Sequence, residues 1–378
     1  MTGIEQQSAS VAANGVRKRI DYWLLFAALM LAAFGLMMVL SSSGIMAERY
    51  FSGKYHFFKK QAVFAAIGVA VMVACARIPR GAFYNLTYVW IAAAIGLLFL
   101  CGFTPLGIAA GGAKRWLNLG VVSIQPLEFA KPALILYLAY FFARKQELVK
   151  SFSVGFIPPF LVTGLLCLLL MLQPDFGGAV FLCGLLFFMC LIGGTRLIYL
   201  ILSLLFAGGA GWLLITSSPY RFKRWTAFLD PFKSAKEEGY QLVQSLYALG
   251  SGKAFGAGLG AGKQKLFFLP EAHNDFIMAV AGEELGFVGL SAIFLCVGFL
   301  LWRCFRVALL QKDLQDRFTA FGLSLVLALG FLLNLAVVLG TVPPKGVPMP
   351  FVSYGGSSLL VSFLCVGFLL NLSRSAVK

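Results

Sequence analysis

This chain of 378 residues has few charged residues, few histidines and no paired cysteine spacing. It contains 15 acidic residues and two histidines, and charged residues make up only 12% of the sequence. Its eight cysteines lie in or beside apolar runs and show no C-x-x-C spacing. Tight metal sites and disulfide frameworks need clustered cysteine or histidine. We therefore expect no metal centre and no disulfide, and we interpret the cysteines as small core residues.

A nucleotide-binding P-loop is also missing. The glycine-rich stretch GSGKAFGAGLGAGKQK, residues 250–265, has some of its features. However, Ala257 stands where the first glycine of the motif belongs, and Gln264 replaces the Ser or Thr. We interpret this stretch as flexible backbone that can approach a substrate closely. No nucleic-acid partner is expected.

Apolar residues are abundant. They make up 60% of the chain, with 37 phenylalanines and a mean hydropathy of +0.87, which is more apolar surface than a soluble fold can bury. Runs of about 17–25 apolar residues match the thickness of a bilayer core. Ten runs approach this length: 22–42, 61–76, 86–103, 124–143, 155–172, 177–194, 197–215, 276–302, 318–341 and 351–372. The sequence therefore predicts an all-α polytopic membrane protein with ten transmembrane helices.

Lysine and arginine set the expected orientation. They gather before the first run and in alternate short loops, which favours a cytoplasmic position for those loops. Ten spans then leave both termini in the cytoplasm, with residues 1–21 as the N-terminal tail and 373–378 as the C-terminal tail. Between them lies a membrane domain of residues 22–372. Residues 216–275, between the seventh and eighth runs, become one long extracytoplasmic loop.

That long loop is strongly basic. Its cations are Arg221, Lys223, Arg224, Lys233, Lys236, Lys253, Lys263 and Lys265. Two interpretations remain: a solvated loop, or a basic surface that faces a polyanionic head group at the outer leaflet. Within the loop, Leu242, Leu246 and Leu249 recur at helical spacing. They predict an amphipathic helix that lies at the membrane interface.

Three further polar clusters lie on the same expected side. Glu128 and Lys131 are three residues apart and should meet on one helix face, either as a functional pair inside a cavity or as a structural ion pair. Asp175 lies in the turn between the fifth and sixth runs, where turn chemistry or ligand binding explains it. Four prolines beside Lys345 predict a rigid re-entrant path in the last outer loop. The clusters converge on one face.

Four motifs resemble the SEDS family (shape, elongation, division and sporulation). They are RWLNLGVVSIQPLEFAK, QPDFGG, HNDFIMAVAGEELGFVG and PPKGVPMPFVSYGGSSLL, in this order over almost the whole chain. The last motif is most similar to the cell-division branch of the family. The resemblance implies a ten-span SEDS-type fold and a peptidoglycan glycosyltransferase. Such an enzyme polymerises lipid II at the outer face of the bacterial cytoplasmic (inner) membrane, here at the division septum. A class B penicillin-binding transpeptidase and other division proteins are the implied partners.

The resemblance also assigns the essential acid to Asp275. A sugar 4-hydroxyl is a poor nucleophile at neutral pH, so a positioned carboxylate would take its proton as the attack proceeds. The leaving pyrophosphate needs cations or hydrogen-bond donors where its charge develops. The predicted substrate-binding residues are Lys345, Lys131, Arg115, Glu128, Gln125, Ser353, Gly355, Gly356, Ser357, His273 and Asp175.

Several roles stay open. His273 either tunes Asp275 or hydrogen-bonds its loop. Glu283 and Glu284, just over two helical turns beyond Asp275, are expected to pair with neighbouring spans or to shape the cavity. No cofactor is certain, but a divalent cation, Mg²⁺ or Mn²⁺, that bridges the pyrophosphate is compatible with the carboxylates present.

Two other functions fit the same residues. A lipid II flippase would also carry polar groups within its spans and broken outer segments. A scaffold that recruits a transpeptidase through its spans would not need Asp275. The gathering of the polar residues at one face, without a comparable midplane set, favours the polymerase over the flippase.

Overall fold

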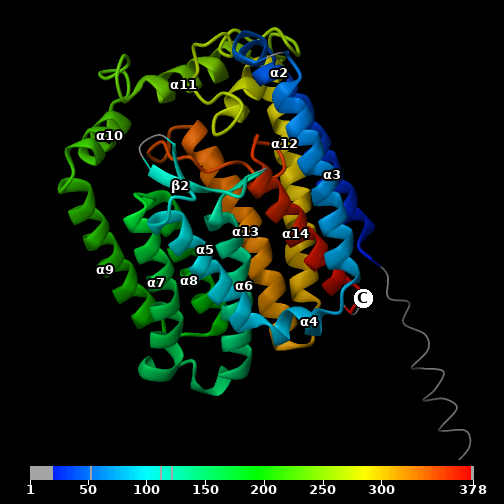
Figure 1. The fold of residues 1–378 in the computed structure, drawn as a ribbon, viewed down its shortest axis with the longest axis vertical. Helices are drawn as coiled ribbons and strands as arrows, with labels where there is room; N and C mark the ends of the chain where they lie inside the picture. Colours follow the sequence, from blue (N-terminus) through cyan, green and yellow to red (C-terminus); the bar gives the residue numbers. More distant parts are fainter. Residues whose placement is uncertain (1–19, 52, 111–112, 121, 376–378) are drawn as a thin grey trace, which may run out of the picture.

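A computed structural model describes residues 20–51, 53–110, 113–120 and 122–375. The fold is a bundle of long helices that stand side by side, with short helices and connecting loops at both ends (Figure 1). The first half comprises α2 (Tyr22–Tyr50), α3 (His56–Arg77), α4 (Arg80–Asn85), α5 (Thr87–Phe103), β1 (Gly107–Ala110), β2 (Ala113–Asn118), β3 (Ser123–Ile124), α6 (Pro126–Arg144) and α7 (Ile157–Leu172). The second half comprises α8 (Phe176–Gly193), α9 (Leu197–Thr216), α10 (Pro219–Leu229), α11 (Tyr240–Gly252), α12 (Ile277–Leu309), α13 (Leu314–Val338) and α14 (Gly356–Ser373).

The predicted apolar runs correspond to helices. In the described ranges, nine helical segments are long and apolar enough to cross a membrane. The remaining run coincides with α5, whose 17 residues fall just short of that length. Helix α7 reaches it only together with the π-helical turn Phe152–Phe156 that precedes it. The polytopic helical fold is therefore confirmed, whereas the count of ten spans stays a prediction. The expected start of the last run at residue 351 is wrong, because residues 351–355 are non-helical and α14 begins at Gly356.

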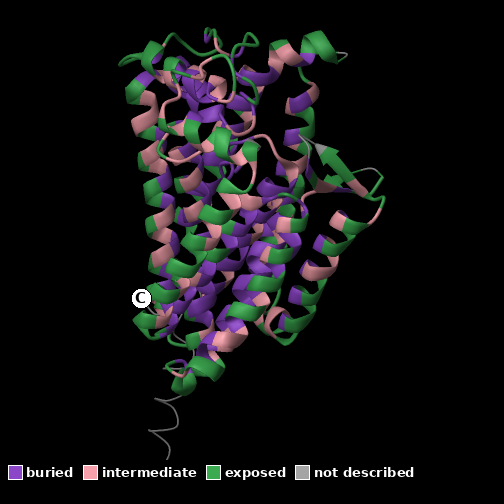
Figure 2. Ribbon diagram, turned by 90° about the vertical axis from the view of Figure 1, so that its left-hand side faces the viewer, coloured by how far each residue is buried: buried purple, intermediate pink, exposed green. Residues whose placement is uncertain are grey.

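The core lies in the centre of the bundle. Helices α6 and α14 bury 78% of their apolar windows, whereas α9 buries only 6%. Figure 2 shows buried residues concentrated in the middle helices and exposed ones on the outside. The outer apolar faces are those that a bilayer would cover. Among the candidate spans, helix α9 is therefore the least buried by the rest of the protein.

A small sheet interrupts the helical architecture and was not predicted. Strands β1, β2 and β3 form an antiparallel sheet in that order. In its register Gly107 pairs with Leu117, and Leu117 pairs in turn with Ile124. The sheet lies between α5 and α6 in the chain and carries Arg115 on its central strand. The described fold is thus helical apart from this short sheet within residues 107–124.

The glycine-rich stretch packs against α12. A Cβ at Gly252 would lie 2.0 Å from the carbonyl oxygen of Gly282, so the two backbones approach as closely as glycine allows. Helix α12 breaks here, since Gly286 has a φ of 67°. A close approach therefore exists between this stretch and α12, and approach to a substrate stays a prediction.

The predicted helix at residues 240–252 is present as α11. Its buried residues include Leu242, Val243 and Ala248, and it packs on α12 and α13. The Ser245 hydroxyl donates to the carbonyl of Val338 at 2.9 Å. The leucine face therefore rests on protein, and the placement of this helix at the membrane interface stays a prediction.

The predicted tails lie largely outside the described residues. Of the expected cytoplasmic segments 1–21 and 373–378, residues 1–19 and 376–378 are not described. Where the chain first becomes described, Asp21 caps α2 by accepting from the Leu24 N–H at 3.0 Å and forms an ion pair with Arg303. This pair joins α2 to the far end of α12.

Candidate active site

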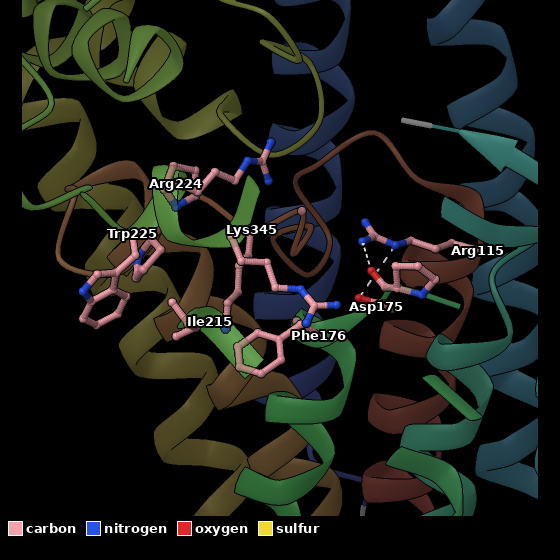
Figure 3. A pocket seen from close by; sticks show the side chains of 13 residues that line it. Arg115, Asp175, Phe176, Ile215, Arg224, Trp225 and Lys345 are labelled. Carbon is pink, nitrogen blue, oxygen red and sulfur yellow. Dashed lines mark hydrogen bonds and ion pairs between the residues drawn. The ribbon is translucent and has the colours of Figure 1, made fainter. Parts of the chain in front are cut away.

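A cavity of about 220 Å³ opens at the end of the bundle that carries α10. The N-terminus of α8, the end of α9, helix α10, strand β2 and the loop before α14 surround it (Figure 3). Its lining residues are Arg115, Pro174, Asp175, Phe176, Gly177, Ile215, Arg221, Arg224, Trp225, Pro343, Pro344, Lys345 and Gly346. The cavity therefore brings together three of the predicted site residues, Arg115, Asp175 and Lys345.

Arg115 and Asp175 form one wall of this cavity. The Asp175 carboxylate caps α8 by accepting from the Gly178 N–H at 3.0 Å. Arg115 Nη2 donates to the carbonyl of Pro174 at 2.8 Å, and its Nε lies 3.8 Å from Asp175 Oδ1. The cap and the ion pair fix Arg115 over the start of α8. The ion pair of Arg115 and Asp175 thus lies at the N-terminus of α8.

Lys345 projects into the cavity from the proline-rich loop. Its Nζ lies 4.8 Å from the ring centroid of Phe176, a cation–π contact. Burial lowers the pKa of Lys345, and the Asp175 carboxylate opposes this effect. Desolvation lowers this pKa because it penalises the charged ammonium group. The same low dielectric strengthens the attraction between the ammonium group and an anion that enters the cavity.

Helix α10 supplies two further cations that the sequence analysis did not assign to the site. Arg221 and Arg224 are three residues apart on α10, so they share a face, and both line the cavity. Trp225 lines it as well and meets Trp212 of α9 edge to face. With Arg115 and Lys345, four cations and one carboxylate line the cavity. This balance suits a multiply charged anion.

Asp275 lies directly behind the cavity wall. A Cβ on Gly346 would stand 3.0 Å from Asp275 Oδ2, so only a bare backbone separates the carboxylate from the lining. The side chain is half-buried. Burial and the nearby Glu271 carboxylate raise the pKa of Asp275 to about 7, and Arg115 opposes them. A carboxylate with such a pKa is suited to general-base work at neutral pH.

His273 faces a different environment from Asp275. Its ring packs against Phe57, at a centroid distance of 4.9 Å, and against Tyr354, at 5.6 Å. Burial lowers the pKa of His273, against the effect of Glu271. This aromatic packing favours the structural interpretation over a direct influence on the acid.

The predicted serines and glycines of residues 353–357 make contacts within the protein. The Ser353 hydroxyl donates to the carbonyl of Asn274 at 2.7 Å, and the Gly355 N–H donates to the Gln61 side chain at 3.2 Å. The Ser357 hydroxyl accepts from the Gln125 N–H at 2.9 Å. A Cβ on Gly356 would lie 2.6 Å from the Phe64 ring. None of these residues lines the cavity; they join α14 to α3, α6 and the Asp275 loop.

Glu128 and Lys131 meet as predicted. Lys131 Nζ donates to Glu128 at 2.6 Å, both side chains are buried, and the ammonium also lies 4.4 Å from the ring centroid of Phe181. Neither residue lines the cavity. The geometry supports the structural ion pair and leaves substrate contact by these two residues a prediction.

Glu283 and Glu284 anchor the glycine-rich stretch. Glu283 accepts from the backbone N–H groups of Lys263 at 2.7 Å and Gln264 at 3.1 Å. Glu284 forms a buried ion pair with Lys265 at 2.6 Å and accepts from the hydroxyl of Ser41 on α2. The expected pairing with a neighbouring span is thus present for Glu284, and most of the remaining contacts go to the loop.

The described residues include no group of three or more His, Cys, Asp and Glu side chains that could hold a metal ion. Only Asp175 among the carboxylates lines the cavity. A divalent cation that bridges pyrophosphate would therefore depend chiefly on phosphate oxygens and water, as Mg²⁺ sites with one or two carboxylates do.

Known proteins are similar to this chain in both sequence and fold. A family model described as "Cell cycle protein", covering FtsW, RodA and SpoVE, matches residues 22–378. The chain belongs to this family, which confirms the SEDS resemblance. It is 40% identical to "Probable peptidoglycan glycosyltransferase FtsW" of Geobacter sulfurreducens, over 94% of this chain and 95% of the relative. It is also 39% identical to "Stage V sporulation protein E" of Bacillus subtilis, over 94% and 97% of the two chains.

Two solved structures are similar over nearly their whole length. One comes from work titled "Structural coordination of polymerization and crosslinking by a peptidoglycan synthase complex", with a TM-score of 0.75 and 27% identity over 94% of this chain and 98% of that one. The other is the rod shape determining protein RodA of Thermus thermophilus, with a TM-score of 0.69 and 26% identity over 95% and 98%. The SEDS-type fold is therefore confirmed.

Proposed function

We propose that this protein is a peptidoglycan glycosyltransferase that polymerises lipid II, in the manner of the FtsW-like members of its family. The observation that carries the proposal is the cavity lined by four cations, with the Asp275 carboxylate directly behind Gly346. A base beside an anion site is what transfer of a sugar from a pyrophosphate requires. The name of the Geobacter sulfurreducens relative supports the same activity.

The chemistry divides between the two parts of the site. Asp275 takes the proton from the 4-hydroxyl of one sugar as its oxygen attacks the anomeric carbon of the muramyl residue in the other substrate. The bond from that carbon to the pyrophosphate oxygen breaks, and the pyrophosphate leaves with the bonding electrons. Arg115, Lys345, Arg221 and Arg224 stabilise the developing charge. Direct displacement converts the α-linked donor into a β-linked product.

Location and partners follow from this activity. The cavity lies at the end of the bundle that the lysine and arginine pattern assigns to the outer side, with both termini in the cytoplasm. Septal synthesis in a bacterial inner membrane fits the FtsW-like sequence. A class B penicillin-binding transpeptidase is the partner we expect, alongside other division proteins. The similar chain from a peptidoglycan synthase complex supports such a pairing.

The test uses purified protein, purified lipid II and a class B transpeptidase, with glycan ladders as the readout. Asp275→Asn is nearly isosteric and removes only the base, so polymer should disappear while the protein stays folded. Lys345→Met removes a cavity charge and should reduce substrate use at least tenfold, because a charge-assisted contact contributes roughly 1.5–3 kcal/mol. Lys233→Met is the matched control, since Lys233 is 85% exposed and lies outside the cavity. Normal ladders from Asp275→Asn would contradict the proposal.

A further inference from the structure

Asn334 joins two loops of the candidate site from below. It lies on α13, and its side chain is fully buried. Its Nδ2 donates to the carbonyl of Asp275 at 2.8 Å and to the carbonyl of Val347 at 2.9 Å. An amide nitrogen has two protons, so both are used. Its Oδ1 accepts no hydrogen bond in the described part of the chain, and this side chain therefore acts purely as a donor to the two loops.

The segment that carries the acid is held at three successive carbonyls. The carbonyl of His273 accepts from the Tyr354 N–H at 3.0 Å, that of Asn274 accepts from the Ser353 hydroxyl, and that of Asp275 accepts from Asn334. The first two donors come from the loop before α14, which could shift together with the acid. Only the third comes from a transmembrane helix, so it ties the segment to the bundle.

The second bond of Asn334 ties the lysine loop to the same point. Asn334 bonds to Val347, which follows Gly346. The missing side chain of Gly346 leaves room for the Asp275 carboxylate, because an added Cβ would lie 3.0 Å from Asp275 Oδ2. Lys345 comes immediately before that glycine. The separation between the base and the ammonium group thus depends on two loops that share one amide as their common support.

We propose that Asn334 is a positioning residue that sets the distance between the Asp275 carboxylate and the Lys345 loop. The inference rests on the proposed function, because it assigns the two loops to the two halves of the transfer reaction. Asn334 itself touches no substrate. It acts through the backbones of Asp275 and Val347.

A purely structural asparagine would behave differently. Burying an amide is unfavourable unless it is hydrogen-bonded, so Asn334 could simply satisfy two carbonyls at the end of α13. Its replacement would then lower stability without a specific effect on turnover. A positioning role instead predicts that kcat falls while KM is little changed, since misplacing a reacting group by about 1 Å can reduce a rate a hundredfold.

The experiment compares Asn334→Leu, which keeps the approximate size and removes both donors, with Ser324→Ala. Ser324 is a fully buried polar residue of the same helix whose hydroxyl donates to the carbonyl of Ala320. Asn334→Leu should lower kcat on the order of a hundredfold. Ser324→Ala should keep kcat near that of the wild type. Amide hydrogen exchange should accelerate in residues 273–276 and 345–347 of Asn334→Leu only.

The pH profile adds a readout that a structural role would not change. When the loops loosen, water reaches the Asp275 carboxylate, and the rising limb of kcat should move to lower pH. Glu271 and Arg115, the charged groups that influence this acid, stay in place. Asn334→Gln keeps the amide on a longer stem and should retain part of the activity. If Asn334→Leu does not fold, this variant carries the same comparison of kcat, exchange and pH profile.

The outcomes separate the two proposals. Exchange in both loops and kcat equal to those of Ser324→Ala would overturn the positioning role, even if Asp275→Asn is inactive. If the wild type makes no glycan, the proposed function fails, and the exchange measurement still decides whether Asn334 holds the two loops. A parallel fall in kcat and protein stability, with an unchanged pH profile, would assign Asn334 to structure alone.

Discussion

At the scale of single residues, the ionisation of Asp275, the proposed base, should affect both activity and stability. Its pKa is raised to about 7, and the base must be deprotonated to act. Polymerisation should therefore rise about tenfold per pH unit below 7 and level off above it. Initial rates from pH 5.5 to 8.5 measure this, with the partner and lipid II held constant. A rate that is flat across this range would contradict the assignment of Asp275 as base.

Stability should change in the opposite direction. Because the pKa of Asp275 is higher in the folded than in the unfolded state, the folded protein binds the proton more tightly. This contribution is present below the ordinary aspartate range and is lost as the pH rises through 7. The wild type is therefore less stable at pH 8, where the buried carboxylate is charged, than at pH 5. The introduced asparagine would carry no charge at either pH, so the gain in Tm of Asp275→Asn over the wild type should be larger at pH 8 than at pH 5.

Residues within motifs could be predicted, and residues that contact them over long separations could not. Asp275, Lys345 and Arg115 stand in recognisable motifs. Asn334 is 59 residues from Asp275 along the chain and lies in an apolar run, where one asparagine gives no signal of its partners. Arg221 could have been identified by its basic helix, but nothing in the sequence indicated that α10 borders the cavity.

At the scale of elements, the helices were predicted because a bilayer demands long apolar runs. The sheet was not, because β1 has four residues and β3 has two, too few for a strand pattern. The packing of α11 on α12 was missed for a related reason. An apolar helix face looks the same in sequence whether lipid or protein covers it. The break of α12 at Gly286 also required knowledge of the loop beside it.

The anchoring of the glycine-rich stretch depends on one buried ion pair. Lys265 and Glu284 are paired at 2.6 Å, and both side chains are almost wholly buried. Removing one partner of such a pair typically costs about 3–5 kcal/mol, because the other charge is left uncompensated. Lys265→Met should therefore lower the Tm and expose residues 253–265 to protease.

The double variant Lys265→Met with Glu284→Met should recover more than half of that loss, since it leaves no lone charge. Lys233→Met provides the control, because its pair with Asp230 is exposed and contributes little. Thermal unfolding in detergent and limited proteolysis measure both effects. If Lys265→Met is as stable as Lys233→Met, the pair does not anchor the stretch.

At the scale of the whole molecule, the position of the charges helps to decide whether the protein is a polymerase or a flippase. The four cavity cations lie together with α10 at one end of the bundle, and Asp275 stands behind Gly346 of the same cavity. The buried pair of Glu128 and Lys131 lies in the first turns of α6, and its charges are already neutralised there. A carrier needs polar groups that a substrate can reach from both sides. A polymerase needs them only where the sugars meet.

A comparison of detergent with sealed bilayers decides between these functions. In detergent both faces are accessible, so transport cannot limit a reaction, and a polymerase should make glycan from lipid II when a class B transpeptidase is present. A flippase would bind lipid II there without forming polymer and would show activity only across a sealed membrane. Because the base and the anion cavity share one face, we expect ladders from the wild type in detergent. Asp275→Asn should give none in either setting. Scrambling of lipid II in vesicles by the wild type, with no ladder in any condition, would assign the protein to transport instead.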